Sequence, residues 1–364
     1  MDRVASVVAA AAVLSACAQA APPLPMALTV SPPRIAARHG VVPEADLRRG
    51  LLQRLAAPVA LPCTEQELPV AYRPAQGRYL EEKNLGRGLA LTLPRGTVVA
   101  RRDSTREVAV YLSNLLDPSS EVGDAGYRVV LADKNGTRKD ASLGFAMFRP
   151  YVVGDNVALP ILDGDVLQLA VDVQEVDDDS ITFPPVGMTT RRTAADRMLR
   201  CPLAAVFRDS DRDGATDVEE ARLGTDPGDA DTDGDGIPDG ADPAPLGASA
   251  ATTPEDAVRS AVLREIVEKE MAGELLWMVT PGPRLDLRGV TFRVLQLRKD
   301  EAREYAKRFG MRVAFSLKVA MKGPDLATVD LDFSWRGESY TATRARGTDR
   351  WTFEESGGWI SAAP

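Results

Sequence analysis

Two twelve-residue stretches decide how this chain is organised: DSDRDGATDVEE at residues 209–220 and DTDGDGIPDGAD at residues 231–242. Both stretches carry acids at positions 1, 3, 5, 9 and 12 and glycine at position 6. Alternate carboxylates on a sharply turned backbone converge on one point, and a hard cation with six to eight oxygen ligands needs such an arrangement. The repeated pattern therefore predicts two calcium-binding loops.

The spacing also predicts the ligands of each ion. Five acidic side chains would face the ion in each loop, and the residue at position 7 would add its backbone carbonyl. The expected ligands are Asp209, Asp211, Asp213, Ala215, Asp217 and Glu220 in the first loop and Asp231, Asp233, Asp235, Ile237, Asp239 and Asp242 in the second. A solvated acidic linker is the alternative, but it would not repeat the same offsets twice.

The acidity of the chain is concentrated in this segment. Residues 209–243 contain eleven Asp, two Glu and two Arg, a net charge of −11, whereas the whole 364-residue chain carries −9. The remainder therefore carries a net charge of +2 and lacks the basic surface that binds nucleic acid. We expect no nucleic-acid partner.

The segment resembles thrombospondin type 3 repeats of bacterial envelope proteins over about 35 of the 364 residues. The second loop is most similar to them because it has Gly234, Gly236 and the short Asp242 at position 12. The first loop is more similar to an EF-hand or dockerin loop because Glu220 occupies position 12. Only a short helix near residues 218–223, ended by Gly224, is expected, so a calmodulin-like opening is not.

The N-terminus resembles a bacterial lipoprotein signal. Arg3 precedes an apolar run at residues 4–13, and the sequence LSAC ends at Cys17 like a lipobox. The run is too short to span a bilayer. The resemblance implies that residues 1–17 are a signal peptide, that Cys17 carries lipid, and that the protein lies on the outer membrane, facing the periplasm or the surface. An ordinary signal cleaved near Ala18 or Ala21 is the alternative.

Two further cysteines, Cys63 and Cys201, remain once the lipobox accounts for the odd one of three. An oxidising periplasm favours a disulfide between them, and two buried thiols are the alternative. The bridge would connect the two ends of a block of strand-like sequence.

The remaining sequence predicts a multidomain chain. Residues 18–62 are rich in Ala and Pro and predict a tether, with one possible helix whose leucines, Leu47, Leu51, Leu52 and Leu55, share a face. Residues 63–201 show short alternating stretches, for example around residues 89–93, 108–112 and 167–173, and predict an all-β antiparallel sandwich. The predicted calcium segment, 209–243, would be a spacer between this block and the last domain, and calcium would make this interdomain joint rigid.

Residues 254–364 predict an α+β domain with a helix on an antiparallel sheet. The helix begins after Thr253, whose side chain can cap it, and its apolar stripe continues to about Met278. A strand near residues 290–297, a helix at 300–309 and a closing meander of strands follow. The element order is similar to cystatin-like or nuclear-transport-factor-like cones.

Catalytic patterns are sparse. The single histidine, His39, lies in the predicted tether, which excludes Ser-His-Asp and Cys-His catalysis. We expect a calcium-binding outer-membrane lipoprotein that is anchored by lipid and acts as an envelope binding or scaffold protein for an unidentified envelope protein or polysaccharide. The alternative is a periplasmic enzyme or ligand carrier with its pocket in the α+β domain. In a third hypothesis, the sandwich is a module that binds carbohydrate or adheres to a partner.

Overall fold

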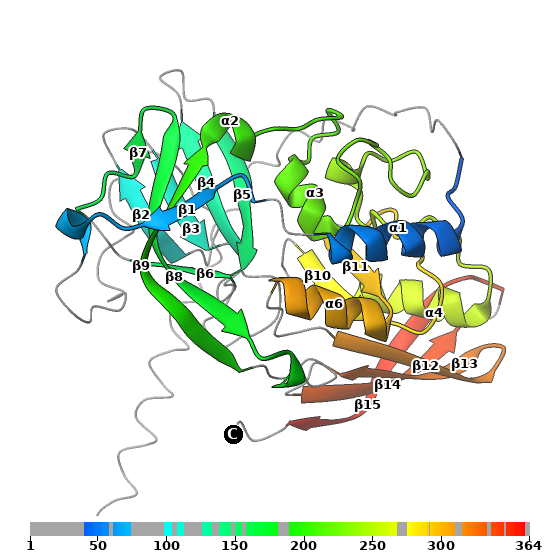
Figure 1. Ribbon diagram of the computed structural model, residues 1–364. Helices are drawn as coiled ribbons and strands as arrows, with labels where there is room; N and C mark the ends of the chain where they lie inside the picture. Colours follow the sequence, from blue (N-terminus) through cyan, green and yellow to red (C-terminus); the bar gives the residue numbers. More distant parts are fainter. Residues whose placement is uncertain are drawn as a thin grey trace, which may run out of the picture. The chain divides into compact units, whose positions relative to one another are not determined.

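The computed structural model describes residues 40–57, 61–73, 98–103, 108–112, 126–132, 138–146, 150–154, 158–180, 189–267, 275–290, 292–309, 315–332, 336–345 and 347–360. The predicted signal peptide with Cys17, residues 18–39 of the predicted tether and the predicted strand at 89–93 lie outside the described residues. Three β-sheets and a few short helices make up the described part, which confirms the expected β-rich organisation (Figure 1).

Two of the sheets come from residues 64–202, and all of their strand pairs are antiparallel. One sheet contains β2 (Val98–Asp103), β3 (Val108–Leu112), β4 (Gly126–Ala132) and β5 (Arg138–Ala146) in that order. The other contains β1 (Thr64–Glu67), β9 (Thr190–Pro202), β8 (Val166–Val176) and β6 (Tyr151–Val153) in that order, with β7 (Leu162–Asp163) beside β8.

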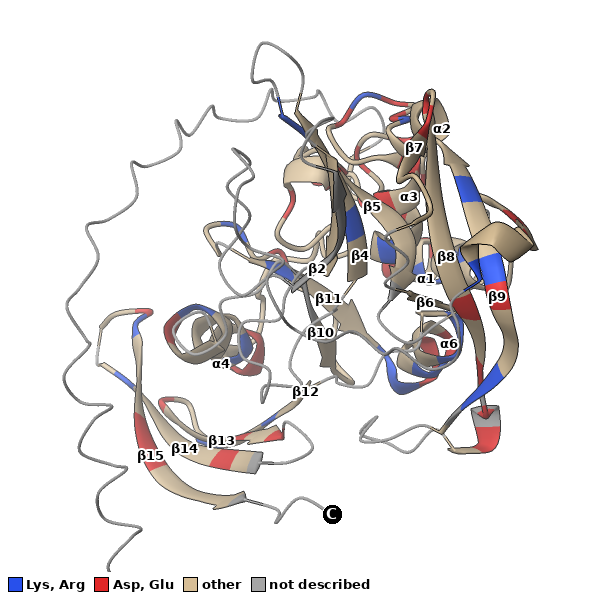
Figure 2. Cartoon of the chain, turned by 90° about the vertical axis from the view of Figure 1, so that its left-hand side faces the viewer, with Lys and Arg blue, Asp and Glu red and all other residues tan. Residues whose placement is uncertain are grey.

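Both sheets contribute to one hydrophobic core. Val110 and Val129 of the first sheet lie in the same buried cluster as Leu167 and Leu199 of the second. The side chains that alternate along β3 and β8 reach this cluster, as the sequence pattern predicted. Ion pairs such as Arg197–Glu65 and Arg192–Asp172 join neighbouring strands of the second sheet, and Figure 2 shows basic and acidic residues along β9.

Cys63 and Cys201 are joined by a disulfide in the structure. Cys201 lies in β9 and is fully buried in the shared core, and Cys63 directly precedes β1. Because Thr64 pairs with Arg200, the bridge lies at the start of the β1–β9 pairing and fixes the first strand to the last strand of the block.

The third sheet lies in the C-terminal part of the chain and has six strands. These are β10 (Leu275–Val279), β11 (Arg293–Leu297), β12 (Phe315–Gly323), β13 (Leu326–Asp332), β14 (Arg336–Arg344) and β15 (Trp351–Ile360), in the order β11-β10-β12-β13-β14-β15. The closing strands β12 to β15 form the predicted antiparallel meander.

The expectation of a wholly antiparallel C-terminal sheet is wrong, because β10 runs parallel to both β11 and β12. The predicted extent of the first helix, to about Met278, is also wrong. Helix α4 (Pro254–Val262) has the expected Thr253 capping box but passes into a π-helical turn at Leu263–Val267, and Met278 lies in β10. Residues 275–279 form an inner strand, where an unbroken apolar run cannot be told from a buried helix by periodicity.

Helix α1 (Glu44–Ala56) confirms the predicted helix within residues 18–62, and its Leu47, Leu51 and Leu55 are buried. It does not lie in an extended tether, however. Leu51 and Leu55 share a core cluster with Trp277 and with Tyr305 of α6 (Lys299–Phe309), beside which α1 is drawn in Figure 1. The sequence shows which face of the helix is apolar, but it does not identify the surface against which that face packs.

Two short helices complete the elements that position the acidic segment: α2 (Leu203–Val206) and α3 (Asp217–Leu223). Helix α3 confirms the short helix predicted there, and it ends at Gly224 with φ 75°. Among the described helices, none is both long enough and apolar enough to cross a membrane.

The disulfide gives a first test of this architecture. The bridge closes a 138-residue separation, so reduction should enlarge the unfolded ensemble and lower the free energy of unfolding by about 2–5 kcal/mol. Thermal unfolding followed by circular dichroism, with and without reductant, measures the loss. The double variant Cys63→Ser/Cys201→Ser should have the melting temperature of the reduced protein, and reductant should not change it. Equal stability in all samples would contradict the structural role of the bridge.

Candidate metal centre

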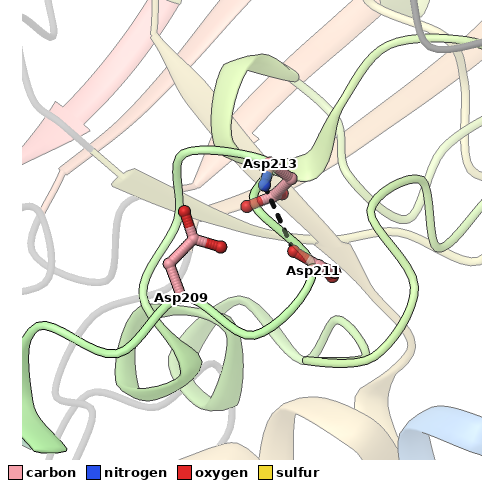
Figure 3. A group of neighbouring side chains, drawn as sticks. All are labelled: Asp209, Asp211 and Asp213. Atoms are coloured by element: carbon pink, nitrogen blue, oxygen red, sulfur yellow. Dashed lines mark hydrogen bonds between the residues drawn. The ribbon is translucent and has the colours of Figure 1, made fainter.

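The first acidic loop, residues 209–220, is held by amides that donate to its own carboxylates. The amide of Arg212 donates to Asp209 Oδ1 (2.7 Å), and the amide of Gly214 donates to Asp209 Oδ2 (3.2 Å). The amide of Asp213 donates to Asp211 Oδ1 (3.2 Å), and the Asp213 carboxylate accepts from the amide of Ala215 (2.7 Å). These bonds wrap the backbone around its acids, and Figure 3 draws the one between Asp213 and Asp211.

The second loop, residues 231–242, repeats this network 22 residues later. Asp231 accepts from the amides of Gly234 (3.0 Å) and Gly236 (2.9 Å). Asp233 accepts from the amide of Asp235 (3.1 Å), and Asp235 accepts from that of Ile237 (2.8 Å). The two stretches are therefore structural repeats as well as sequence repeats.

The left-handed backbone positions also repeat. Gly214 and Gly236, at position 6, have φ 99° and 92°, where glycine avoids a steric cost. Arg212 and Gly234, at position 4, have φ 68° and 76°. Position 4 therefore accepts a side chain in the first loop, although an arginine in this conformation costs about 1 kcal/mol.

The acids gather into three groups, in each of which carboxylate oxygens lie within 4.8 Å of one another. The groups are Asp209, Asp211 and Asp213; Asp231, Asp233 and Asp235; and Asp213, Glu220 and Asp239. The first group is drawn in Figure 3. Positions 1, 3 and 5 thus meet in both loops, as the spacing predicted.

Four buried carboxylate oxygens have no hydrogen-bond partner among the residues that the structure describes. They are Asp211 Oδ2 and Glu220 Oε2 in the first loop and Asp233 Oδ2 and Asp242 Oδ2 in the second. These are positions 3 and 12 of both loops. A buried carboxylate oxygen without a partner is costly, and its recurrence at the same two positions fits a cation that both loops would hold.

The acids at position 9 lie differently from the prediction. Asp217 accepts from the amide and hydroxyl of Ser210 (2.9 and 3.0 Å) and pairs with Arg208, and it is in none of the three groups. In the same way, the Asp239 carboxylate accepts from the amide (3.0 Å) and the hydroxyl (2.6 Å) of Thr232. Asp239 nevertheless also lies in the third group. The acid at position 9 therefore holds its own loop through hydrogen bonds. Of the two acids, only Asp239 also belongs to a group of carboxylates that could hold a metal ion.

Asp239 reaches the first loop because the two loops pack on each other. The amide of Gly240 donates to Asp213 Oδ2 (2.6 Å), and a Cβ on Gly240 would lie 2.5 Å from the backbone nitrogen of Ala215. Only glycine fits this contact. Asp239 of the second loop thus lies beside Asp213 and Glu220 of the first. The spacing within either loop alone does not predict this group. The carbonyl ligands expected at Ala215 and Ile237 stay a prediction.

Burial and mutual repulsion raise the pKa of these acids. Burial, together with the charges of Asp211, Asp213 and Asp239, raises the pKa of Glu220 to about 9. The pKa of Asp239 rises to about 9, again chiefly through burial. In the second loop, burial and neighbouring carboxylates raise the pKa of Asp242 to about 8 and that of Asp233 to about 7. A bound cation would favour the charged form of each group.

The acidic segment is not an isolated spacer between domains. Arg128 of β4 pairs with Glu219 (2.7 Å), which joins the segment to the first half of the chain. On the C-terminal side, Arg288 pairs with Asp235 (2.9 Å), and the amide of Val294 donates to the carbonyl of Pro243 (2.7 Å). The segment that was expected to be a rigid joint therefore packs on both neighbours.

Comparison of the chain with protein-family models, with curated proteins and with solved structures finds no match in any of the three.

The raised pKa values predict an unusual pH dependence of stability. An unfolded carboxyl titrates at roughly 4, below the values of about 9 for Glu220 and Asp239. These groups therefore stabilise the ion-free fold at pH below about 4, and the contribution is lost as the pH rises towards about 9. We expect the melting temperature in chelator to fall across this window and the stabilisation by calcium to grow.

Thermal unfolding at a series of pH values, in chelator and in calcium, measures both trends. Glu220→Gln removes one of the raised groups and should flatten the slope in chelator. Identical slopes with and without calcium would contradict this electrostatic account.

Proposed function

We propose that residues 209–243 bind two calcium ions and that the ions hold the segment in its packed form. The observation that carries the proposal is the repeated pair of unpartnered buried oxygens, at positions 3 and 12 of both loops. Two Ca²⁺ would offset four of the eleven net negative charges of the segment. They would also supply the partners that these oxygens lack.

The donor set favours calcium among common metals. The three groups offer carboxylate oxygens alone, with no histidine or cysteine, so zinc and other metals that prefer nitrogen or sulfur are poorly matched. Magnesium binds with near-ideal octahedral geometry and usually keeps several waters. Calcium accepts more oxygens and more varied geometry, which suits a crowded set of buried carboxylates.

We propose a constitutive structural role for the ions. The helix that follows the first loop, α3, has only seven residues, too short for the helix-pair opening of a sensor. Loops of the extracellular type bind calcium at roughly 10⁻⁴ to 10⁻³ M. Such affinities suit a protein outside the cytoplasm, where calcium is always present.

We further propose that the chain is an outer-membrane lipoprotein that acts as an envelope binding or scaffold protein, as its similarity to type 3 repeats of envelope proteins suggests. Within this proposal, the two antiparallel sheets with their common core form a β-sandwich, and the C-terminal sheet with α4 forms a cone-like domain. The partner would be an envelope protein or a polysaccharide.

A second candidate function, ligand carriage or periplasmic catalysis, is favoured by one pocket in the C-terminal part. It has a volume of about 330 Å³ and lies between the π-helical turn at Leu263–Val267 and strands β14 and β15. Three of its seven lining residues are aromatic and two are charged; these are Tyr340, Trp351 and Phe353, and Glu265 and Arg350. Pockets of this size and lining bind small molecules in other proteins.

Isothermal titration calorimetry of two matched variants tests the calcium proposal. Asp239→Asn and Asp217→Asn make the same change at position 9 of each loop. Only Asp239 lies beside Asp213 and Glu220, so Asp239→Asn should weaken calcium binding on the order of tenfold or more, because affinity depends on ligand charge. Asp217→Asn should bind like wild type. Absence of calcium binding at millimolar concentration would refute the proposal.

The lipid anchor is tested at Cys17. If Cys17 carries lipid, the mature protein should partition into the detergent phase of a phase-separation assay, and Cys17→Ala should leave the protein soluble or unprocessed. Cys63→Ser is the control, because it removes a cysteine without touching the lipobox. A processed Cys17→Ala protein that still partitions into detergent would contradict lipidation.

A further inference from the structure

The second acidic loop and Gly224, which follows the first loop, both contact a segment that precedes them by more than 150 residues. This segment, residues 40–56, consists of helix α1 and the residues before it, 40–43, which we call the approach. The approach contacts the second loop, and the C-terminal part of α1 contacts Gly224 at the end of α3. From these contacts we infer that calcium controls the docking of α1 onto the rest of the protein. The inference rests on the calcium binding proposed above.

The first contact joins the approach to α1 with the second loop. The backbone amide of Val42 donates to the backbone carbonyl of Asp233 (2.8 Å). Asp233 occupies position 3, where its Oδ2 is buried and without a partner. One residue therefore offers its side chain to the ion and its carbonyl to the N-terminal segment, so the position of the carbonyl depends on the loop being closed.

The second contact lies next to the first and depends on glycine. A Cβ on Gly234 would lie 2.1 Å from the carbonyl oxygen of Gly40 and 3.3 Å from the side chain of Val42. The equivalent residue of the first loop is Arg212, with a similar φ. The loop itself thus tolerates a side chain at position 4, and the contact with Gly40 is what requires glycine in the second loop.

The third contact joins α1 to the helix that leaves the first loop. Arg54 Nε donates to the carbonyl of Gly224 (2.9 Å), the residue that ends α3. A Cβ on Gly224 would lie 2.5 Å from Leu51. Since Glu220, at position 12 of the first loop, lies within α3, an ion that fixes Glu220 also fixes the surface on which α1 packs.

Loss of calcium should therefore loosen both attachments of α1 to the acidic segment. The repelling carboxylates would separate, and the carbonyls of Asp233 and Gly224 would move with them. Contacts with the C-terminal part remain, such as Glu44 with Arg284 (3.0 Å). We expect a helix that is docked in calcium and frequently released in chelator.

Hydrogen–deuterium exchange of the full-length chain, read by mass spectrometry, tests the inference. Calcium chloride should slow exchange of the backbone amides of residues 42–56 about tenfold relative to chelator, within the usual range of 5–150-fold for coupled sites. Gly234→Asn should abolish that slowing while calorimetry still shows calcium bound. Arg212→Asn makes the matched change at position 4 of the first loop and should behave like wild type.

The outcomes separate this inference from the proposal on which it rests. If calcium binds and protects residues 209–243 but leaves exchange at 42–56 unchanged, calcium binding stands and control of α1 is overturned. Full protection of 42–56 in Gly234→Asn would also overturn it. If calorimetry detects no calcium binding, both ideas fall together.

Discussion

The structure depends on one electrostatic constraint, which is the burial of carboxylates next to one another. Glu220, Asp233 and Asp239 are each 0 % exposed, and each lies close to other acids. Buried charges persist in proteins when they are paired or bound to a metal. The turns of both loops, the contact between the loops and the surface that receives α1 are all built around these side chains.

Each carboxylate at positions 3 and 12 divides its oxygens between the chain and the proposed ion. Asp211 and Asp233 each accept a backbone amide on Oδ1, and their Oδ2 atoms have no partner among the described residues. Asp242 follows the same rule, since its Oδ1 accepts the amide of Ala244 (2.7 Å). One oxygen thus orients the side chain, and the other is left for a ligand that the protein chain does not provide.

The sequence predicted those features that local pattern determines. The convergence of the acids at positions 1, 3 and 5 of each loop depends on residues close in sequence. The same is true of the end of α3 at Gly224, the cap at Thr253 and the alternation of β12 to β15. Short-range hydrogen bonds and side-chain periodicity suffice for such features. They include most of the candidate site, because the candidate ligands of each loop lie within twelve residues.

Other features depend on contacts between distant residues, and the sequence did not predict them. Nothing in the apolar run around Met278 distinguishes an inner strand from a helix. The apolar face of α1 is visible in the sequence, but its packing against Tyr305 and Leu223 is not. The approach of Asp239 to the first loop depends on how two loops pack, which no spacing within one loop encodes.

The arginines around the segment contact its outside and not the buried oxygens at which the ion is proposed to bind. Arg288 binds the carboxylate and carbonyl of Asp235, and Arg293 binds the carbonyl of Gly240. A guanidinium is planar and broad, and neither group reaches the unpartnered oxygens of Glu220 or Asp242. The arginines therefore bind the outside of the segment, and the proposed ion, which is small enough to fit among carboxylates, would occupy its interior. Without the ion, the segment would remain attached to its neighbours at the surface and loosen from within.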